Sequence, residues 1–210
     1  LAGPANKQGR IAADNICGGN SRFTGSQGSS VLKLFGLTAA STGINEKAAQ
    51  AAGIAYDKVV LFPASHATYY PGAQSMAMKV LYEKESLRLL GAQIVGGDGV
   101  DKRIDVLATA IRAKMTALEL TELDLSYAPP YSSAKDPVNM AGFMIEDLES
   151  EKVRQFHWNE VEDLPCDGSA TLLDVRTAWE YQRGHLDGFR NIPLDDLREH
   201  LDELDRGKPV

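Results

Sequence analysis

The sequence predicts an α+β domain followed by the start of a separate α/β unit. Two apolar runs of strand type, residues 75–82 and 87–95, flank a polar turn at 83–86 and predict a β-hairpin. Residues 101–115 repeat apolar side chains at helical spacing, which predicts an amphipathic helix that packs on a sheet. Residues 171–175 form an apolar run without alternation, which is typical of a strand buried on both faces in α/β units.

Helices and short strands precede the hairpin. Residues 4–17 predict a helix with a proline in its first turn. Residues 31–37 and 58–62 are apolar runs that predict two strands. Between them, Asn45 is a candidate N-cap for a short helix at 46–52. We therefore expect helices packed against a mostly antiparallel sheet.

The rest of the chain combines a long loop with further helices. Residues 126–137 hold three prolines and two tyrosines and predict a loop. Residues 138–148 predict the last helix of the first domain, and residues 177–183 and 194–204 predict helices that follow the buried strand. The second unit has no room for a complete sheet, so we expect it to be the first part of a domain.

Composition and charge narrow the class of protein. The 210 residues are 43% hydrophobic, as in soluble globular proteins, and no apolar run approaches the roughly 18 residues of a membrane span. The formal net charge of −7 disfavours nucleic acid as a partner. Residues 151–210 carry 14 of the 29 acidic residues but 8 of the 22 basic ones, which supports a boundary near residue 150.

The two cysteines and the first residue indicate the setting of the chain. Cys17 and Cys166 lie far apart, so they suit neither a disulfide framework nor a metal pattern. A reducing cytoplasm is the simplest location, and no metal or membrane is expected. The chain begins with Leu1 and not with Met, so the native start is expected upstream.

Three segments together resemble the pyridine nucleotide–disulfide oxidoreductases. They are residues 1–16 (LAGPANKQGRIAADNI), 25–43, and the stretch from 66–71 (HATYYP) to 127–136 (YAPPYSSAKD). The similar branch contains coenzyme A-disulfide reductase, NADH oxidase and NADH-dependent persulfide reductase. The resemblance implies the tail of an FAD-binding domain at 1–20 and a dimerisation domain at 21–148.

A separate segment resembles the first half of a rhodanese domain, over residues 153–210. The motifs are LDVR at 173–176, Glu180, GHLDG at 184–188 and NIPL at 191–194. The order of the two domains is similar to that of the reductases with a fused rhodanese.

The rhodanese resemblance also assigns roles to single residues. It implies that Asp174 and Arg176 organise the unit through a salt bridge or loop contacts and that His185 has a structural hydrogen bond. In that family the sulfur-accepting cysteine lies in a loop that follows the next strand, and residues 208–210 resemble the start of that strand. Cys166 precedes the first strand, so it stands in the wrong place for this role.

The first resemblance implies an enzyme activity and its cofactors. The parent enzyme would be a homodimer that passes a hydride from NADH or NADPH to FAD. Electrons would then reach a cysteine that reduces a small-molecule disulfide or persulfide, expected to be linked to coenzyme A. The protein's part would be binding, orientation and electrostatic tuning.

The same resemblance selects candidate site residues. Two tyrosines, Tyr69 and Tyr127, would lie near the flavin and redox cysteine of the partner subunit. A phenol with a pKa near 10 can donate a hydrogen bond to a thiolate at neutral pH. The alternative is a pair of amphipathic interface tyrosines. The residues expected to bind the flavin, through the N-terminus of the first helix and a phenol, are Leu1, Ala2, Gly3, Pro4 and Tyr127.

Four more residues have weaker assignments. The resemblance places Asn6 near the coenzyme A substrate, and Lys135 could pair with a phosphate or carboxylate of that substrate. A solvated loop lysine is the alternative for Lys135. His66 is either a proton donor or a hydrogen-bonded structural residue. Cys17 is expected to be a buried structural cysteine on the apolar side of its helix.

Three hypotheses remain open. The chain can be part of a flavin-dependent reductase with a fused rhodanese, which the tyrosine motifs favour. It can be a sulfurtransferase whose upstream region is a non-catalytic scaffold. It can also be a dimerisation module with no activity of its own. A flavin spectrum in the full-length protein separates the first two.

Overall fold

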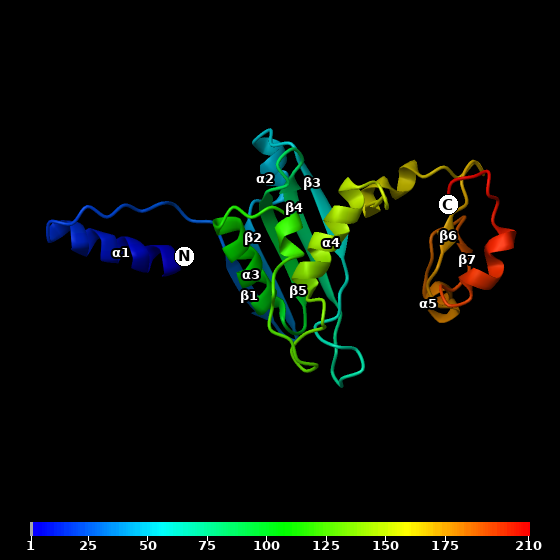
Figure 1. Cartoon of the computed structure of the whole chain (residues 1–210), viewed down its shortest axis with the longest axis horizontal. Coiled ribbons are helices and arrows are strands. Elements are labelled where there is room, and N and C mark those ends of the chain that lie inside the picture. The colour runs from blue at the N-terminus through cyan, green and yellow to red at the C-terminus, as the bar shows by residue number, and fades with distance from the viewer. Residues whose placement is uncertain (1) are drawn as a thin grey trace. The chain divides into compact units, whose positions relative to one another are not determined.

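The structure is a computed structural model that describes residues 2–210, and it divides into two compact units (Figure 1). The first unit is Leu1–Gln155 and the second is Phe156–Val210. The elements of the first unit are α1 (Ala2–Ile16), β1 (Ser30–Leu34), β2 (Leu37–Gly43), α2 (Glu46–Ala51), β3 (Tyr56–Leu61), β4 (Met76–Glu83), β5 (Leu89–Gly96), α3 (Val100–Arg112), the 3₁₀ helix η1 (Leu118–Leu120) and α4 (Pro137–Glu149).

The first unit is built on an antiparallel sheet with strand order β1-β2-β5-β4-β3. Helix α3 packs on β2 and β5, and α4 packs on β3 and η1 (Figure 1). The core between sheet and helices includes Met78 and Ile94 from the strands and Leu107 and Ile145 from the helices. Burial of such side chains is the main favourable term in folding. The predicted α+β class is confirmed.

The prediction of one strand over residues 31–37 was wrong. The chain turns at Phe35, whose φ is 51°, and at Gly36, so β1 ends at Leu34 and β2 runs from Leu37 to Gly43. The sequence of β2, with small and hydroxyl residues, carries a weak strand pattern. Pairing with both β1 and β5 holds this strand in the sheet.

The other predicted elements of the first unit were confirmed, with ends shifted by a few residues. Asn45 caps α2, because its Oδ1 accepts a hydrogen bond from the Ala48 amide at 2.9 Å. The predicted hairpin is β4–β5, and the predicted helices at 101–115 and 138–148 are α3 and α4. The end of β2 approaches β5 so closely that a Cβ on Gly91 would lie 1.9 Å from the Ile44 carbonyl oxygen.

The sheet face opposite α3 carries charged and apolar side chains. Glu46 of α2 forms ion pairs with Lys58 of β3 at 2.5 Å and with Lys79 of β4 at 2.7 Å. A row of apolar side chains also crosses four strands in register on this face. Its members are Leu32, Ala39, Val95 and Ala77. Leu32 and Val95 are 61% and 46% exposed, so this row is available for contact with another surface.

Strand β3 forms one edge of the sheet, and side chains satisfy three of its backbone hydrogen-bonding groups. The amide of Gln155 donates to the Val60 carbonyl at 2.7 Å and accepts from the Val60 N–H at 3.0 Å. The Asp57 carboxylate accepts from the Lys58 N–H at 2.8 Å. The last residue of the first unit is therefore attached to the edge strand.

Helix α1 has no buried residue, and Ile16 at its end is 86% exposed. Its described residues therefore have little tertiary packing to stabilise the helix, which leaves its own backbone hydrogen bonds. Cys17 follows this helix and is exposed, so the expectation of a buried cysteine was wrong. The cause is that α1 has no covered face in which the thiol could be buried.

The second unit contains a two-stranded parallel sheet. Its elements are the 3₁₀ helix η2 (Trp158–Asp163), β6 (Leu173–Asp174), α5 (Ala178–Arg183), β7 (Arg190–Asn191) and the 3₁₀ helix η3 (Leu197–Glu203). The predicted strand at 171–175 is shorter and only half-buried, because it has one partner strand and incomplete cover. The predicted helix at 194–204 is a 3₁₀ helix. No helix in the described part of the chain is long and apolar enough to cross a membrane.

Candidate functional site

Two loops of the first unit bring Tyr69 and Tyr127 together. Tyr69 lies between β3 and β4, and Tyr127 lies between η1 and α4. Their phenol oxygens are 3.1 Å apart, although the residues are 58 positions apart in the sequence. The side chains are 75% and 47% exposed, so both phenols are open to a molecule that approaches this end of the sheet.

The contact changes the acid–base behaviour of the pair. The hydrogen bond with Tyr69 raises the pKa of Tyr127 above its ordinary value of 10.0, and burial adds a smaller effect. Tyr127 therefore stays protonated at neutral pH. A protonated phenol can donate a hydrogen bond to an anionic atom such as a thiolate sulfur.

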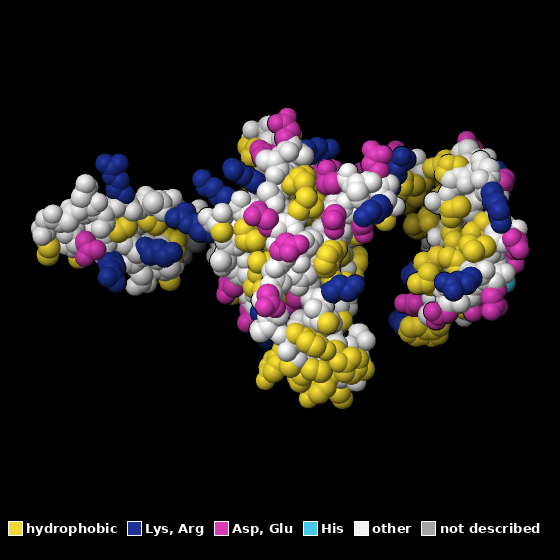
Figure 2. Space-filling model, viewed as in Figure 1, with side chains coloured by type: hydrophobic (Ala, Val, Ile, Leu, Met, Phe, Trp, Pro, Cys, Tyr) yellow, Lys and Arg dark blue, Asp and Glu magenta, His cyan; other side chains and the backbone are white. Residues whose placement is uncertain are grey.

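The two tyrosine-bearing loops are also joined through their backbones. The Ala67 N–H donates to the Ser132 carbonyl at 3.1 Å. Hydrophobic side chains gather at this end of the unit (Figure 2), where Tyr70 and Tyr131 are 42% and 72% exposed. The site thus combines an apolar surface with a pair of phenol groups.

Of the two roles expected for His66, the contacts support that of a hydrogen-bonded structural residue. It is buried, its Nδ1 lies 3.1 Å from the Ala67 carbonyl oxygen, and its ring meets Tyr70 edge-on at 5.8 Å between centroids. These contacts fix the ring beneath the tyrosine loop. The imidazole therefore supports the loop, and no hydrogen bond among the described residues joins it to the phenol pair.

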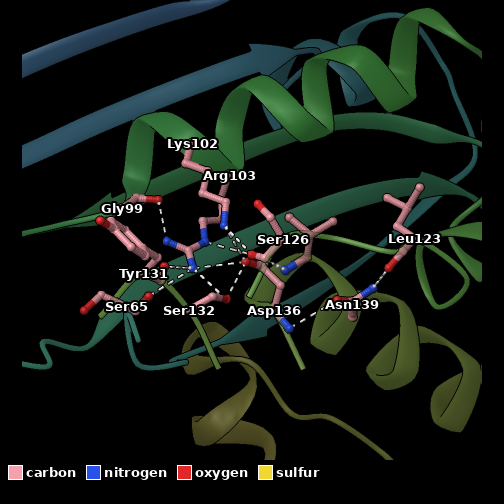
Figure 3. A network of polar contacts seen from close by, with 11 residues as sticks. Ser65, Gly99, Lys102, Arg103, Leu123, Ser126, Tyr131, Ser132, Asp136 and Asn139 are labelled. Carbon is pink, nitrogen blue, oxygen red and sulfur yellow. Dashed lines mark hydrogen bonds and ion pairs between the residues drawn. The ribbon is translucent and has the colours of Figure 1, made fainter. Parts of the chain in front are cut away.

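A buried polar network that sequence reasoning missed connects the loops to the helices (Figure 3). Arg103 of α3 is 1% exposed and pairs with Asp136, which is 3% exposed, at 3.0 Å. Asp136 caps α4 by accepting from the Val138 N–H, and its own N–H donates to Asn139. The Asn139 side chain in turn donates to the carbonyl of Leu120, the last residue of η1, and to the carbonyl of Leu123 in the turn that follows.

Two signals in the sequence could have revealed this network. Arg103 precedes Leu107 and Ala110 at i+4 and i+7, so it occupies a position on the apolar face of the helix. An arginine at a core position needs buried partners. Asp136 precedes a proline and stands three residues before Asn139, which is the pattern of a capped helix start.

Within the part of the chain that the structure describes, no hydrogen bond or ion pair joins the remaining predicted site residues to the tyrosine pair. Ala2, Gly3 and Pro4 form the first turn of α1, and Leu1 lies outside the described residues. The Asn6 side chain donates to the Ala2 carbonyl at 2.9 Å within that helix.

Lys135 is exposed in the loop directly before α4. Among residues 2–210, the hydrogen bonds and ion pairs join neither Asn6 nor Lys135 to Tyr69 or Tyr127. The roles of both residues in substrate binding therefore stay predictions.

In the second unit, Asp174 and Arg176 form the expected organising pair. The Arg176 guanidinium contacts both carboxylate oxygens of Asp174 and donates to the Gly184 carbonyl at 2.9 Å. His185 stacks on Tyr181 at 3.8 Å between ring centroids, and its Nδ1 lies 3.0 Å from the Tyr181 carbonyl oxygen. These contacts join the segment before α5, and α5 itself, to the loop that follows the helix. Cys166 is exposed and precedes β6.

Comparison with known proteins places both units. Residues 30–137 match the pyridine nucleotide-disulphide oxidoreductase dimerisation domain, and residues 157–210 match the rhodanese-like domain. A coenzyme A disulfide reductase from Staphylococcus haemolyticus is 41% identical over 149 residues, which are 70% of this chain and 33% of that protein.

Two solved structures are similar over nearly the whole chain. The crystal structure of reduced CoADR-RHD from Bacillus anthracis has 47% identity and a TM-score of 0.90, over 99% of this chain and 37% of that one. A NAD-dependent persulfide reductase from A. fulgidus has 42% identity and a TM-score of 0.87, over 96% of this chain and 36% of that one.

These matches identify the family of the chain, although the chain aligns with only part of each relative. The chain spans about a third of the length of the curated relatives that it matches. The dimerisation-domain match covers residues 30–137, which is more than half of the 210 residues. The chain therefore belongs to the pyridine nucleotide-disulphide oxidoreductase family.

Proposed function

We propose that this chain forms part of a homodimeric, FAD-dependent NAD(P)H reductase that acts on disulfides or persulfides linked to coenzyme A. The rhodanese-like unit would handle the sulfur. The names of the relatives support this proposal, since they include coenzyme A disulfide reductases and a NAD-dependent persulfide reductase. The observation that carries it is the exposed pair of phenols, with oxygens 3.1 Å apart.

The tyrosine pair would act on sulfur. Cleavage of a disulfide or persulfide leaves negative charge on a sulfur atom, and a thiolate is also the attacking species. In the proposed reaction, Tyr127 and Tyr69 donate hydrogen bonds to that sulfur and remain protonated themselves. A hydrogen bond to a charged group contributes about 1.5–3 kcal/mol. The phenols would thus stabilise the charged sulfur without a second titrating base.

The residues expected near the flavin leave room for a planar group. A Cβ added to Gly3 would meet no atom within 4 Å, and the first turn of α1 is exposed. A helix N-terminus offers unpaired N–H groups and partial positive charge, which suit a reduced ring system. FAD, when bound, would supply the electron transfer from NAD(P)H. Ala2, Gly3 and Pro4 would orient it, and Tyr127 would approach it from the partner subunit.

The homodimer has its own support and its own test. The matched family domain is a dimerisation domain, and the open face of the sheet carries an exposed apolar row that includes Leu32 and Val95. In the proposed two-fold dimer, the tyrosines of one subunit would lie at the flavin site of the other, as the family resemblance implies, and symmetry would make this site occur twice. Light scattering of the folded chain at micromolar concentration should give the mass of a dimer, and a monomer would contradict the proposal.

Removal of the phenol groups tests the catalytic role. In the full-length enzyme, Tyr69→Phe and Tyr127→Phe keep the rings and remove only the donors. Each should lower turnover by roughly 10- to 150-fold, which corresponds to the loss of about 1.5–3 kcal/mol. Tyr70→Phe and Tyr131→Phe, on the same two loops, are the matched controls and should keep full turnover. Equal turnover in all four variants would contradict the proposal.

Mixing of variants tests whether the tyrosines act across the dimer. A double Tyr69→Phe/Tyr127→Phe enzyme is mixed with an enzyme that lacks its redox cysteine. Subunit exchange produces heterodimers in which an intact cysteine faces intact tyrosines if the pair acts in trans. Activity should then rise above that of both parents. Activity no higher than that of the tyrosine variant would show that the pair acts within one subunit or is structural.

The sulfurtransferase hypothesis makes a different prediction. Transfer of sulfur needs a thiolate nucleophile, and Cys166 lies before β6, outside the loop expected for that cysteine. We therefore propose that the chain alone has no thiosulfate sulfurtransferase activity. A cyanide assay measures it, and robust activity that disappears in Cys166→Ser would favour the sulfurtransferase.

A further inference from the structure

We infer that Arg103 is a positioning residue, whose guanidinium holds the two tyrosine-bearing loops together so that the phenols of Tyr69 and Tyr127 meet. This inference rests on the proposed function of the tyrosine pair for its effect on turnover. Its structural part, the dependence of the phenol contact on Arg103, stands independently of that function.

Arg103 extends from α3 to both loops (Figure 3). Its Nη2 donates to the Ser65 carbonyl at 3.0 Å, four residues before Tyr69. The same nitrogen donates to the Tyr131 carbonyl at 3.2 Å, four residues after Tyr127. A single buried nitrogen therefore bonds to the backbones of both loops.

The rest of the guanidinium is fixed to the helices. Its Nε lies 3.3 Å from one Asp136 oxygen, while Nη2 lies 3.0 Å from the other and 3.1 Å from the Ser132 hydroxyl. Its Nη1 donates to the Gly99 carbonyl at the start of α3. The guanidinium thus contacts both loops and the starts of α3 and α4, so a shift of either loop would lengthen at least one of these contacts.

The charge of the pair is maintained inside the protein. Burial alone would raise the pKa of Asp136, but hydrogen bonds from Val138, Ser132 and Arg103 outweigh it and lower the pKa. Asp136 therefore remains ionised opposite the guanidinium. Lys102 adds a second positive charge 3.5 Å from the same carboxylate.

The tyrosine side chains have little packing of their own. Tyr69 is 75% exposed and Tyr127 is 47% exposed. The positions of their phenols consequently follow the positions of the loop backbones, which Arg103 joins through its hydrogen bonds. Lysine cannot replace it, because an ammonium is a point donor that lacks the planar fork of five N–H groups.

The first experiment measures the phenol contact in this chain by NMR with labelled tyrosine. In Arg103→Lys we expect loss of the contact between the Tyr69 and Tyr127 rings, together with a fall of the raised pKa of Tyr127 toward its ordinary value. Arg112→Lys, at the exposed end of the same helix, is the matched control and should keep both. The signal of buried Tyr82 shows that the unit is folded. An unchanged contact in folded Arg103→Lys overturns the inference.

A second variant covers the case in which Arg103→Lys does not fold. The double change Arg103→Gln/Asp136→Asn removes both buried charges together, so neither is left unpaired, and the shorter Gln side chain cannot reach the position of the nitrogen that bonds to both loops. Loss of the contact between the tyrosine rings in the folded double variant supports the inference. An unchanged contact overturns it.

The second experiment measures turnover in the full-length flavoprotein. Arg103→Lys should lower kcat roughly 10-fold or more with a smaller change in KM, as expected when a transition-state hydrogen bond is lost. Added to Tyr69→Phe/Tyr127→Phe, it should cause no further loss, since both changes remove one interaction. Normal turnover in Arg103→Lys, with slow tyrosine variants, overturns the inference and leaves the proposed function intact. Normal turnover in the tyrosine variants overturns the proposed function, and the NMR experiment still decides the structural role.

Discussion

Glu46 should stabilise the first unit in a manner that depends on pH. Burial alone would raise its pKa, but hydrogen bonds and charges from Lys58 and Lys79 outweigh this effect and lower the pKa from 4.5 to about 2. The Glu46 side chain is 23% exposed, so solvent screens the two ion pairs only in part. The ion pairs connect α2 to the strands β3 and β4.

The magnitude follows from the shift of the pKa. Each pKa unit corresponds to 1.36 kcal/mol, so a fall from 4.5 to about 2 contributes about 3 kcal/mol of stability. Because the folded pKa is the lower one, this contribution is complete above pH 4.5 and is lost as the pH falls toward 2. Between pH 7 and pH 3 it should decrease by about 2 kcal/mol.

The perturbation is Glu46→Gln, which removes the charge and keeps the shape. Urea unfolding is followed through the NMR signal of Tyr82, because both tryptophans, Trp158 and Trp179, lie in the second unit. At pH 7 the variant should be less stable by up to about 3 kcal/mol, and the difference from the wild type should shrink toward pH 3. Glu85→Gln, in the exposed β4–β5 turn, is the control. A difference that stays constant from pH 7 to pH 3 would refute the pKa argument.

Three further predictions concern the first unit. Tyr82→Phe should lower the free energy of unfolding by about 1 kcal/mol in urea, because Tyr82 donates to Glu149 at 2.8 Å. Gly91→Ala should destabilise by at least about 2 kcal/mol, since its Cβ would collide with the Ile44 carbonyl, whereas Gly36→Ala, with open space, should unfold like the wild type. Amide hydrogens of α1 should exchange faster than those of α3, because α1 buries no residue; equal protection would contradict this.

Sequence patterns predicted the elements with strong local signals. The hairpin β4–β5 has two apolar runs around a polar turn, and α2 has a capping Asn45, so each could be recognised within its own segment. Strand β2 could not, because its small residues form a strand through pairing with two neighbours. The position of its turn depends on a positive φ at Phe35, which is an uncommon conformation for that residue.

The candidate site shows the same division between local and distant information. The resemblance to a known family selected Tyr69 and Tyr127, but residue types alone did not show that their oxygens meet. Arg103 remained hidden because its partners come from loops and helices far away in the sequence. Its position on an apolar helix face indicated burial, yet spacing alone could not name Asp136 as the partner.

Two side chains cover part of the edge that strand β3 presents to other chains. An exposed edge strand is a template on which a foreign strand can add, and that is a route to aggregation. The Gln155 amide occupies both hydrogen-bonding groups of Val60, and the Asp57 carboxylate occupies the Lys58 N–H. An incoming strand would have to displace these side chains before it could pair. Release of Gln155 from Val60 would therefore leave the edge free to pair with a strand of another molecule and would lower the solubility of the first unit.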